Sequence, residues 1–230
     1  MQAIKTWLEN QVRWHLFPVK KKITLYVTRK KIKKRICGKN NKLDLKHSKR
    51  TSVISIEGDD NRMIISKDIK IGSMNLKIYG DRNTLIINDR VCIDDIQIIF
   101  NGNGCKIEID CDTYISNGTL LCAETDTHIS IGKCCMFAYG FEIRTGDSHG
   151  IFDKKTHSRL NPGKSIDIGQ HVWLGNRVLV LKGGSIPDGC IVGAHSVVTK
   201  PLSAKDALYA GSPVKLLKED VVWSWHLTHM

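Results

Sequence analysis

The sequence predicts an all-β solenoid: a parallel β-helix of hexapeptide repeats, with short flanking helices and one protruding loop. Three observations lead to this prediction. An aliphatic residue stands at every sixth position from Ile168 to Val198, paired aliphatic residues recur at intervals of 22 from Met63 to Ile131, and the register breaks once between these stretches. With 230 residues, the chain is long enough to bury a sizeable core.

The strict repeat lies in the second half of the chain. An α-helix has a period of 3.6 residues and a half-buried strand has a period of two, so a six-residue period fits neither. It fits a coil in which each hexapeptide forms a short strand and a turn, with the aliphatic side chain inward and a small residue at the bend. Three such strands would close a rung of about 18 residues. The aliphatic positions are Ile168, Leu174, Val180, Ile186, Val192 and Val198.

The repeat in the first half is longer but regular. Turn-forming residues such as Asp60-Asn61 precede each aliphatic pair, and the extra residues of each repeat are expected to form longer corners. We interpret residues 53–200 as one continuous solenoid. The pairs are Met63/Ile65, Leu85/Ile87, Ile107/Ile109 and Ile129/Ile131.

The two flanks differ from the repeat. Residues 1–52 are predicted to be a basic N-terminal arm with a capping helix, in which Ile4, Leu8 and Val12 lie on one side. That helix would either cap the end of the solenoid or rest on a membrane surface. Residues 201–230 are predicted to be a C-terminal tail that includes a short helix over residues 215–225.

Positive charge is concentrated in the arm. Residues 1–50 hold 16 Lys and Arg against two acidic residues, whereas the remainder holds 19 basic and 21 acidic residues. Such an arm suits an anionic glycan or a membrane surface. Nucleic acid is not expected as a partner, because the arm shows no recognised motif or regular aromatic interleaving. A solvated arm without a partner is the alternative.

Composition also bears on location and redox state. No apolar run approaches the roughly 18 residues that cross a bilayer, and the first 30 residues show no secretory signal. We therefore expect a cytoplasmic protein, at the inner face of the membrane if the arm binds there. The eight cysteines contain no C-x-x-C pair, which favours reduced thiols over a disulfide framework or a cysteine zinc site.

The break in register points to a functional loop. Between Ile131 and Ile168 the spacing is 37 residues, and a loop leaving a solenoid is a usual location for function. His149 stands in this loop with Asp147 and Asp153 on either side. An imidazole can accept the proton of an alcohol near neutral pH, and either carboxylate could orient its second nitrogen. The sequence does not choose between the two aspartates.

Three segments resemble the signatures of the hexapeptide-repeat, left-handed β-helix acyltransferases, in that family's order. They are residues 168–175 (IGQHVWLG), 191–200 (IVGAHSVVTK) and 210–218 (AGSPVKLLK). The resemblance is detailed over about residues 129–220 and weak back to about 53. It is greatest to the O-acetyltransferases of sugars and polysaccharides, including those of maltose, galactosides and polysialic acid. It implies a left-handed β-helix and a homotrimer with acetyl-CoA in the groove between neighbouring solenoids.

The same resemblance implies roles for individual residues. His149, which precedes Trp173 by 24 residues, would be the general base, and Trp173 would lie near the acetyl group. The sequence departs from the family at Val214, where alanine is frequent, and at Lys182, where the turn usually carries a shorter side chain. Lysines suit the phosphates of coenzyme A. The expected coenzyme contacts are Asn176, Ala194, Thr199, Lys200, Lys215 and Lys218.

Together these features predict an acetyl-CoA-dependent O-acetyltransferase that needs no metal. Its acceptor would be a carbohydrate hydroxyl, most simply on a surface or capsular polysaccharide such as a sialic acid polymer. Acetylation of an antibiotic or a small sugar is the first alternative. A second is a zinc hydratase of the carbonic-anhydrase type, for which His128, His149 and His171 would have to converge across a subunit boundary. A purely structural β-helix is the third.

Overall fold

The structure is a computed structural model that describes residues 33–45 and 52–227. The chain divides into two compact units, which are described separately. One unit comprises Lys30–Val222, and the other combines Met1–Arg29 with Trp223–Met230. In the described part of the second unit, Trp223 and Trp225 pack edge to face with their ring centroids 5.6 Å apart.

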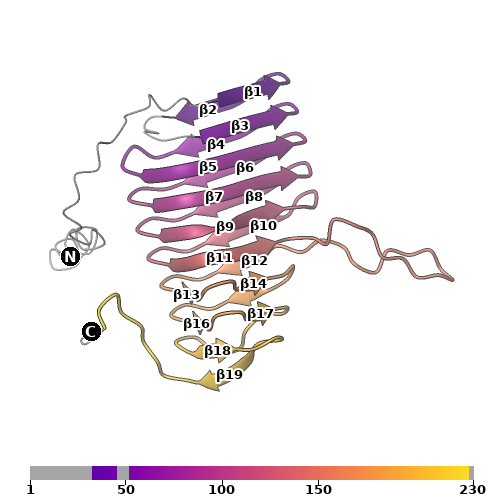
Figure 1. Ribbon diagram of the computed structural model, residues 1–230. Coiled ribbons are helices and arrows are strands. Elements are labelled where there is room, and N and C mark those ends of the chain that lie inside the picture. Colours follow the sequence, from indigo (N-terminus) through magenta and orange to yellow (C-terminus); the bar gives the residue numbers. More distant parts are fainter. Residues whose placement is uncertain (1–32, 46–51, 228–230) are drawn as a thin grey trace. The chain divides into compact units, whose positions relative to one another are not determined.

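The first unit is a parallel β-solenoid whose rungs stack one upon the next (Figure 1). Its described residues form 19 strands and no helix. A sheet of seven strands contains β2 (Lys42–Leu45), β4 (Arg62–Ile65), β6 (Thr84–Ile87), β8 (Lys106–Ile109), β10 (His128–Ile131), β12 (Ile166–Ile168) and β15 (Ser185–Ile186). A sheet of twelve contains β1 (Lys33–Cys37), β3 (Ser52–Glu57), β5 (Lys70–Tyr79), β7 (Cys92–Asn101), β9 (Tyr114–Cys122), β11 (Met136–Arg144), β13 (Trp173–Leu174), β14 (Leu179–Val180), β16 (Ile191–Val192), β17 (Val197–Val198), β18 (Leu208–Ala210) and β19 (Lys215–Lys218).

The larger sheet covers two faces of the solenoid. The first half of β11 pairs with β13, and its second half pairs with β14. Between the halves the register shifts after Tyr139, and Gly140 adopts a φ of 79°, which favours glycine. We call the face of β13, β16 and β18 the first face, that of β14 and β17 the second face, and the seven-stranded sheet the third face.

Alternation along the strands defines the core. In β6, Leu85 and Ile87 point inward and are fully buried, whereas the intervening Ile86 is only partly buried. Leu85 pairs with Ile107 on the next rung, as the interval of 22 residues predicts. Burying each such side chain is worth about 1.5–3 kcal/mol. The predicted inward register is therefore confirmed.

Asparagine side chains form hydrogen bonds from rung to rung along the corner between the second and third faces. The Oδ1 atom of Asn61 accepts a hydrogen bond from the Asn83 N–H (2.9 Å), and Asn83 Oδ1 accepts one from the Cys105 N–H (2.9 Å). Backbone N–H groups at a turn would otherwise lack partners in this buried place. The corner is thus held by side chains in addition to the sheets.

One predicted boundary and one predicted helix need correction. The solenoid begins at or before Lys33, because β1 pairs with β3 and β2 pairs with β4. The basic side chains of β1 stay exposed, so their charge does not prevent backbone pairing in this rung. The helix predicted over residues 215–225 is wrong: β19 pairs antiparallel with β18, which satisfies the open edge of the sheet.

The predicted N-terminal capping helix lies outside the described residues. Among the residues that are described, there is no helix with the length and apolarity needed to cross a membrane.

The predicted protruding loop is a hairpin of residues 145–164, which projects from the solenoid between β11 and β12 (Figure 1). Ile129 of β10 pairs directly with Ile166 of β12, so the break in register falls where the sequence places it. Phe152 and Arg159 form an antiparallel bridge across the hairpin, and the Leu160 N–H donates to the Ile151 carbonyl (2.7 Å).

Candidate functional site

The hairpin leaves the solenoid at the corner between the second and third faces. Its base is closed by a hydrogen bond from the Lys164 N–H to the Thr145 carbonyl (2.9 Å). Arg144, the last residue of β11, donates to the Gly146 carbonyl and to Ser148 Oγ, each at 3.0 Å. The outgoing strand of the hairpin is therefore tied to a strand of the solenoid.

Asp147 connects the hairpin to the next rung. Its Oδ2 atom accepts hydrogen bonds from Lys182 Nζ (2.6 Å) and from Asn161 Nδ2 (2.8 Å). Lys182 follows β14, and its Nζ also donates to the Asn161 carbonyl (3.0 Å). These two hydrogen bonds hold the pKa of Asp147 below its usual value, and the bond from the Lys182 ammonium has the larger effect. The carboxylate is ionised at neutral pH and anchors both strands of the hairpin.

Asn161 is the central residue of this base. Only 7% of it is exposed, although it stands in a projecting hairpin. Besides the bond to Asp147, Nδ2 donates to the His149 carbonyl (2.8 Å), and Oδ1 accepts from the Ile151 N–H (2.6 Å). One amide side chain therefore fixes the backbone both at His149 and two residues beyond it.

A second ion pair holds the opposite side of the hairpin. Arg159 donates two hydrogen bonds to Glu124 (3.0 and 2.5 Å), and this pairing lowers the pKa of Glu124. A Cβ atom added to Gly146 or Gly163 would lie 2.7 or 2.2 Å from Glu124 Cγ, so both strands pass close to this side chain. The base of the hairpin is held between Glu124 on one side and Lys182 on the other.

His149 itself is exposed on the hairpin. Its backbone carbonyl is bound by Asn161, whereas its imidazole forms no hydrogen bond within the described residues. The ring is therefore available to accept a proton from an incoming hydroxyl.

The predicted contact between an aspartate and this imidazole is corrected in both cases. Asp153 Oδ1 accepts hydrogen bonds from the Lys155 N–H (2.9 Å) and from the N–H (2.7 Å) and Oγ1 (3.0 Å) of Thr156. These bonds shape the tip of the hairpin and lower the pKa of Asp153. Asp147 acts on the backbone of the hairpin through Asn161 and Lys182.

Three of the other predicted residues lie toward the first face. Trp173 is partly buried at the start of β13. Asn176 is exposed at the following corner, where its Oδ1 accepts a hydrogen bond from the Tyr139 N–H (3.2 Å). Ala194 is exposed at the same corner of the next rung. The backbone of Gly175 packs closely against it, because a Cβ atom added to Gly175 would lie 2.7 Å from the Ala194 nitrogen.

The remaining predicted residues are exposed on the last rungs. Thr199 and Lys200 follow β17, one rung beyond Lys182. Lys215 and Lys218 begin and end β19. None of these three predicted lysines has an ion-pair partner among the described residues, so their ammonium groups are free to meet phosphates. This arrangement fits the nucleotide end of a coenzyme A ester.

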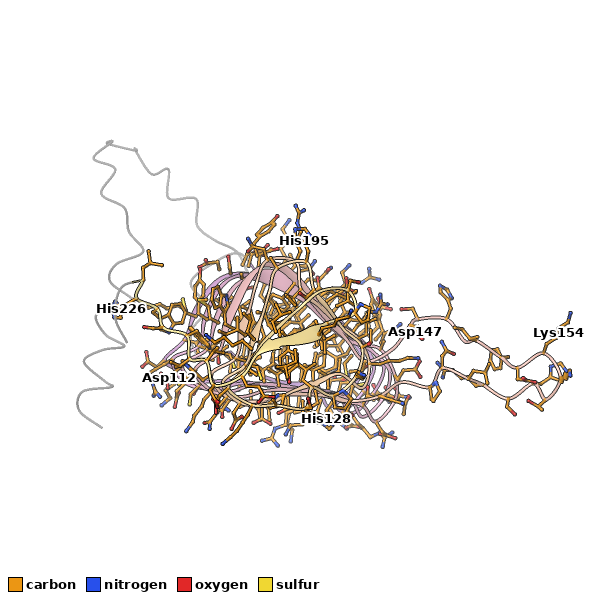
Figure 2. The ribbon with its side chains drawn as sticks, turned by 90° about the horizontal axis from the view of Figure 1, so that it is seen from below. Asp112, His128, Asp147, Lys154, His195 and His226 are labelled. Carbon is orange, nitrogen blue, oxygen red and sulfur yellow. The ribbon has the colours of Figure 1, made fainter. Side chains whose placement is uncertain are left out.

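One chain does not bring all of these residues together. Figure 2 looks along the solenoid: Asp147 lies at one corner, Lys154 lies far out on the hairpin that leaves there, and His195, the neighbour of Ala194, lies at another corner. His149 thus shares its corner of the solenoid with Lys182 and Lys200, and Asn176 belongs to a different corner. The candidate site is divided between two edges of the same solenoid.

Within one chain, the histidines proposed for a zinc site are also apart. His128 lies on β10, where its Nε2 is 3.0 Å from Asp167 Oδ1, whereas His149 is on the hairpin and His171 is at the corner before β13. Within residues 33–45 and 52–227 there is no group of three or more His, Cys, Asp or Glu side chains that could hold a metal ion.

Sequence reasoning missed the residues that hold the hairpin. Glu124, Arg159 and Asn161 carry no recognised motif, and their partners are 10 to 35 residues away in sequence. The one available signal was Lys182, a long side chain at a turn where a shorter one is usual. That side chain reaches Asp147 of the hairpin.

A parallel β-solenoid with a histidine-bearing hairpin and free lysines on its last rungs defines the class: a hexapeptide-repeat β-helix acyltransferase. No protein-family model matches the chain. A polysialic acid O-acetyltransferase of Neisseria meningitidis is 36% identical over 195 residues, which cover 84% of this chain and 89% of the relative. One from Escherichia coli O1:K1 is 32% identical over 121 residues, or 53% of this chain and 39% of that relative.

Solved structures agree with the sequence relatives. The crystal structure of the polysialic-acid-specific acetyltransferase NeuO has a TM-score of 0.74 and 25% identity, covering 87% of this chain and 91% of that one. The polysialic acid O-acetyltransferase OatWY has a TM-score of 0.59 and 31% identity, covering 76% and 93%. The chain belongs to the polysialic acid O-acetyltransferase family, and the predicted left-handed β-helix of an O-acetyltransferase is confirmed.

Proposed function

We propose that this protein transfers an acetyl group from acetyl-CoA to a hydroxyl of a sialic acid polymer. The observation that carries the proposal is the 36% identity with a polysialic acid O-acetyltransferase over 84% of this chain. A hairpin that presents His149 with an unoccupied imidazole is consistent with it, because general-base help to an alcohol is worth roughly 10²–10⁴-fold in rate.

The chemistry requires one proton to move twice. His149 takes the proton of the acceptor hydroxyl as that oxygen forms a bond to the thioester carbon. The imidazolium then gives the proton to the sulfur as the carbon–sulfur bond breaks, which leaves free coenzyme A and an acetyl ester. Acetyl-CoA supplies the activated acyl group, and the protein supplies the base and the geometry.

The coenzyme would be held by the residues of the last rungs. Lys200, Lys215 and Lys218 are exposed and unpaired among the described residues, and they would meet the phosphates as point charges. Thr199 would lie near them. Asn176 and Ala194 would contact the pantetheine arm, and Trp173 would lie near the acetyl group.

We propose that the protein acts as a homotrimer, as the family resemblance implies, and the division of the site supports an assembly of several copies. His149 and Asn176 belong to different corners of one solenoid, so a neighbouring copy must complete the site if both act on the same acetyl group. In this assembly the hairpin of one copy would face the Asn176 corner of the next. Mixing His149→Ala chains with chains that carry Trp173→Ala should restore part of the activity, and no restoration would contradict a shared site.

The basic arm would retain the anionic polymer or hold the enzyme at the inner face of the cytoplasmic membrane through salt-screened contacts. Residues 1–32 hold eight of the chain's 35 basic residues. Their removal should reduce activity on the polymer more than activity on a sialic acid monomer. Equal losses on both acceptors would contradict this role.

Release of coenzyme A thiol tests the proposed function. With acetyl-CoA present, polysialic acid should stimulate thiol release well above the rate with chloramphenicol or with maltose. Stimulation by the antibiotic or the small sugar alone would replace the polymer with a small-molecule acceptor. No stimulation by any of the three would overturn the transferase assignment.

A further inference from the structure

A network of polar side chains that touches none of the reacting groups decides where His149 is presented. We propose that Asn161 is a positioning residue for His149, anchored to the solenoid by Lys182 and Asp147. This inference rests on the proposed function, because it takes His149 as the base. It assigns a role to Asn161, which no sequence signature marks.

The hydrogen bonds of Asn161 determine how its amide is oriented. Nδ2 faces two acceptors, the Asp147 carboxylate and the His149 carbonyl, and Oδ1 faces the Ile151 N–H. A flipped amide would place its oxygen against both acceptors. Aspartate could accept from Ile151 but could not donate, and leucine could do neither. The position therefore requires an amide.

These bonds act on the backbone around the imidazole. The carbonyl of His149 and the N–H of Ile151 are both held, so the short segment that carries the ring is fixed at two points. The ring forms no hydrogen bond of its own within the described residues, so its position depends on this backbone. A displacement of about 1 Å at a reacting group can reduce the rate by about 10²-fold.

Lys182 connects the amide to the rigid part of the molecule. Its Nζ binds one strand of the hairpin through Asp147 (2.6 Å) and the other through the Asn161 carbonyl (3.0 Å). The preceding residue, Leu181, donates its N–H to the Val198 carbonyl of the next rung (2.9 Å), so the lysine starts from a fixed corner. The position of His149 is therefore set by the stack of rungs.

The kinetic test is a double-mutant cycle. Asn161→Ala should lower kcat by about 10- to 100-fold with the KM for acetyl-CoA nearly unchanged, because positioning of the base is lost and coenzyme contacts remain. In a His149→Ala background, Asn161→Ala should have almost no further effect. Lys182→Met should lower kcat less, and Lys182→Arg should recover part of that loss.

A matched control comes from the hydrogen-bonded asparagines at the corner between the second and third faces. Asn61 is a buried asparagine at the corner between the second and third faces, with side-chain bonds to the Asn83 N–H and the Gly80 carbonyl. Asn61→Ala should lower the melting temperature at least as much as Asn161→Ala but leave kcat unchanged below that temperature. Equal loss of kcat in both variants would make the effect one of general stability.

Two outcomes would overturn the positioning role: an unchanged kcat in Asn161→Ala, or the same fold-loss with and without His149. Hydrogen exchange separates this from failure of the proposed function. In Asn161→Ala the Ile151 amide should exchange faster whether or not the protein transfers acetyl groups. Unchanged exchange would show that Asn161 does not hold the backbone at Ile151, which would refute the positioning role. Faster exchange in a protein without transferase activity would refute the proposed function alone.

Discussion

The rungs of the solenoid are held by parallel backbone pairing and inward aliphatic side chains, whereas the hairpin of residues 145–164 is held by a few polar side chains at its base. In the rungs each inward side chain is supported by equivalents above and below. In the hairpin, the side chain of Asn161 makes three hydrogen bonds to three different residues, and no equivalent residue on a neighbouring rung duplicates them. Substitutions in the rungs should therefore affect stability, and substitutions in the hairpin should affect chemistry.

The largest expected effect is on the chemistry of the hairpin. His149→Ala should lower kcat by at least about 10²-fold, because no other base would take the proton of the acceptor hydroxyl. Its melting temperature should stay close to that of the wild type, since the side chain is exposed. Steady-state kinetics with circular dichroism melts would measure both. A turnover near the wild-type value would remove His149 from the mechanism.

The reverse pattern is expected in the rungs. Ile107 is fully buried in β8, and Ile107→Ala should lower the free energy of unfolding by about 2–5 kcal/mol through lost burial and the cavity that remains. Below its melting temperature the variant should keep its kcat. Glu108→Ala, at the outward position beside it, is the control and should change stability by no more than about 0.5 kcal/mol. If both variants were equally stable, the core would be elsewhere.

A smaller effect is expected on the last rungs. Replacing Lys215 and Lys218 together by alanine should raise the KM for acetyl-CoA by about 10-fold and leave kcat less affected, because two exposed charges near phosphates are lost. Increased salt should produce the same trend in the wild type. An unchanged KM in the double variant would place the nucleotide end of the coenzyme elsewhere.

Acid should loosen the hairpin before the rungs. The pKa values of Asp147 and Glu124 in the folded protein lie below their usual values, so their contribution is present above the ordinary carboxyl pKa and is lost as the pH falls through the lowered one. Below about pH 4, the protection factor of the Ile151 amide should fall while that of Ile109 in β8 persists. Simultaneous loss at both amides would contradict a separately held hairpin.

The sequence was sufficient for the parts of the fold that repeat. Inward pairs such as Leu85/Ile87 and the break before Ile168 mark the rungs and the hairpin because each rung imposes the same spacing. The rung that contains β1 escaped notice because its side chains are exposed and three of them are basic, so only backbone pairing defines it. The prediction of a helix over residues 215–225 was wrong because the open edge of the sheet made a strand more favourable there.

The candidate site was only partly predictable. A motif spacing can single out His149, but it cannot show that Asp153 closes the hairpin tip or that Asp147 binds Lys182. Those contacts depend on side chains that meet across rungs. Asn161 is the clearest case, since its function depends on three partners within the hairpin and on none of its sequence neighbours.

The most direct test of the central claim is to follow the acetyl group itself. Incubation of the full chain with polysialic acid and acetyl-CoA labelled with ¹³C in its acetyl group should produce a ¹³C ester signal on the polymer in NMR spectra. The signal should disappear on mild alkaline treatment and should be at least about 10²-fold slower to form with His149→Ala. A polymer that remains unlabelled while acetyl-CoA is consumed, or labels equally fast without His149, would contradict the account.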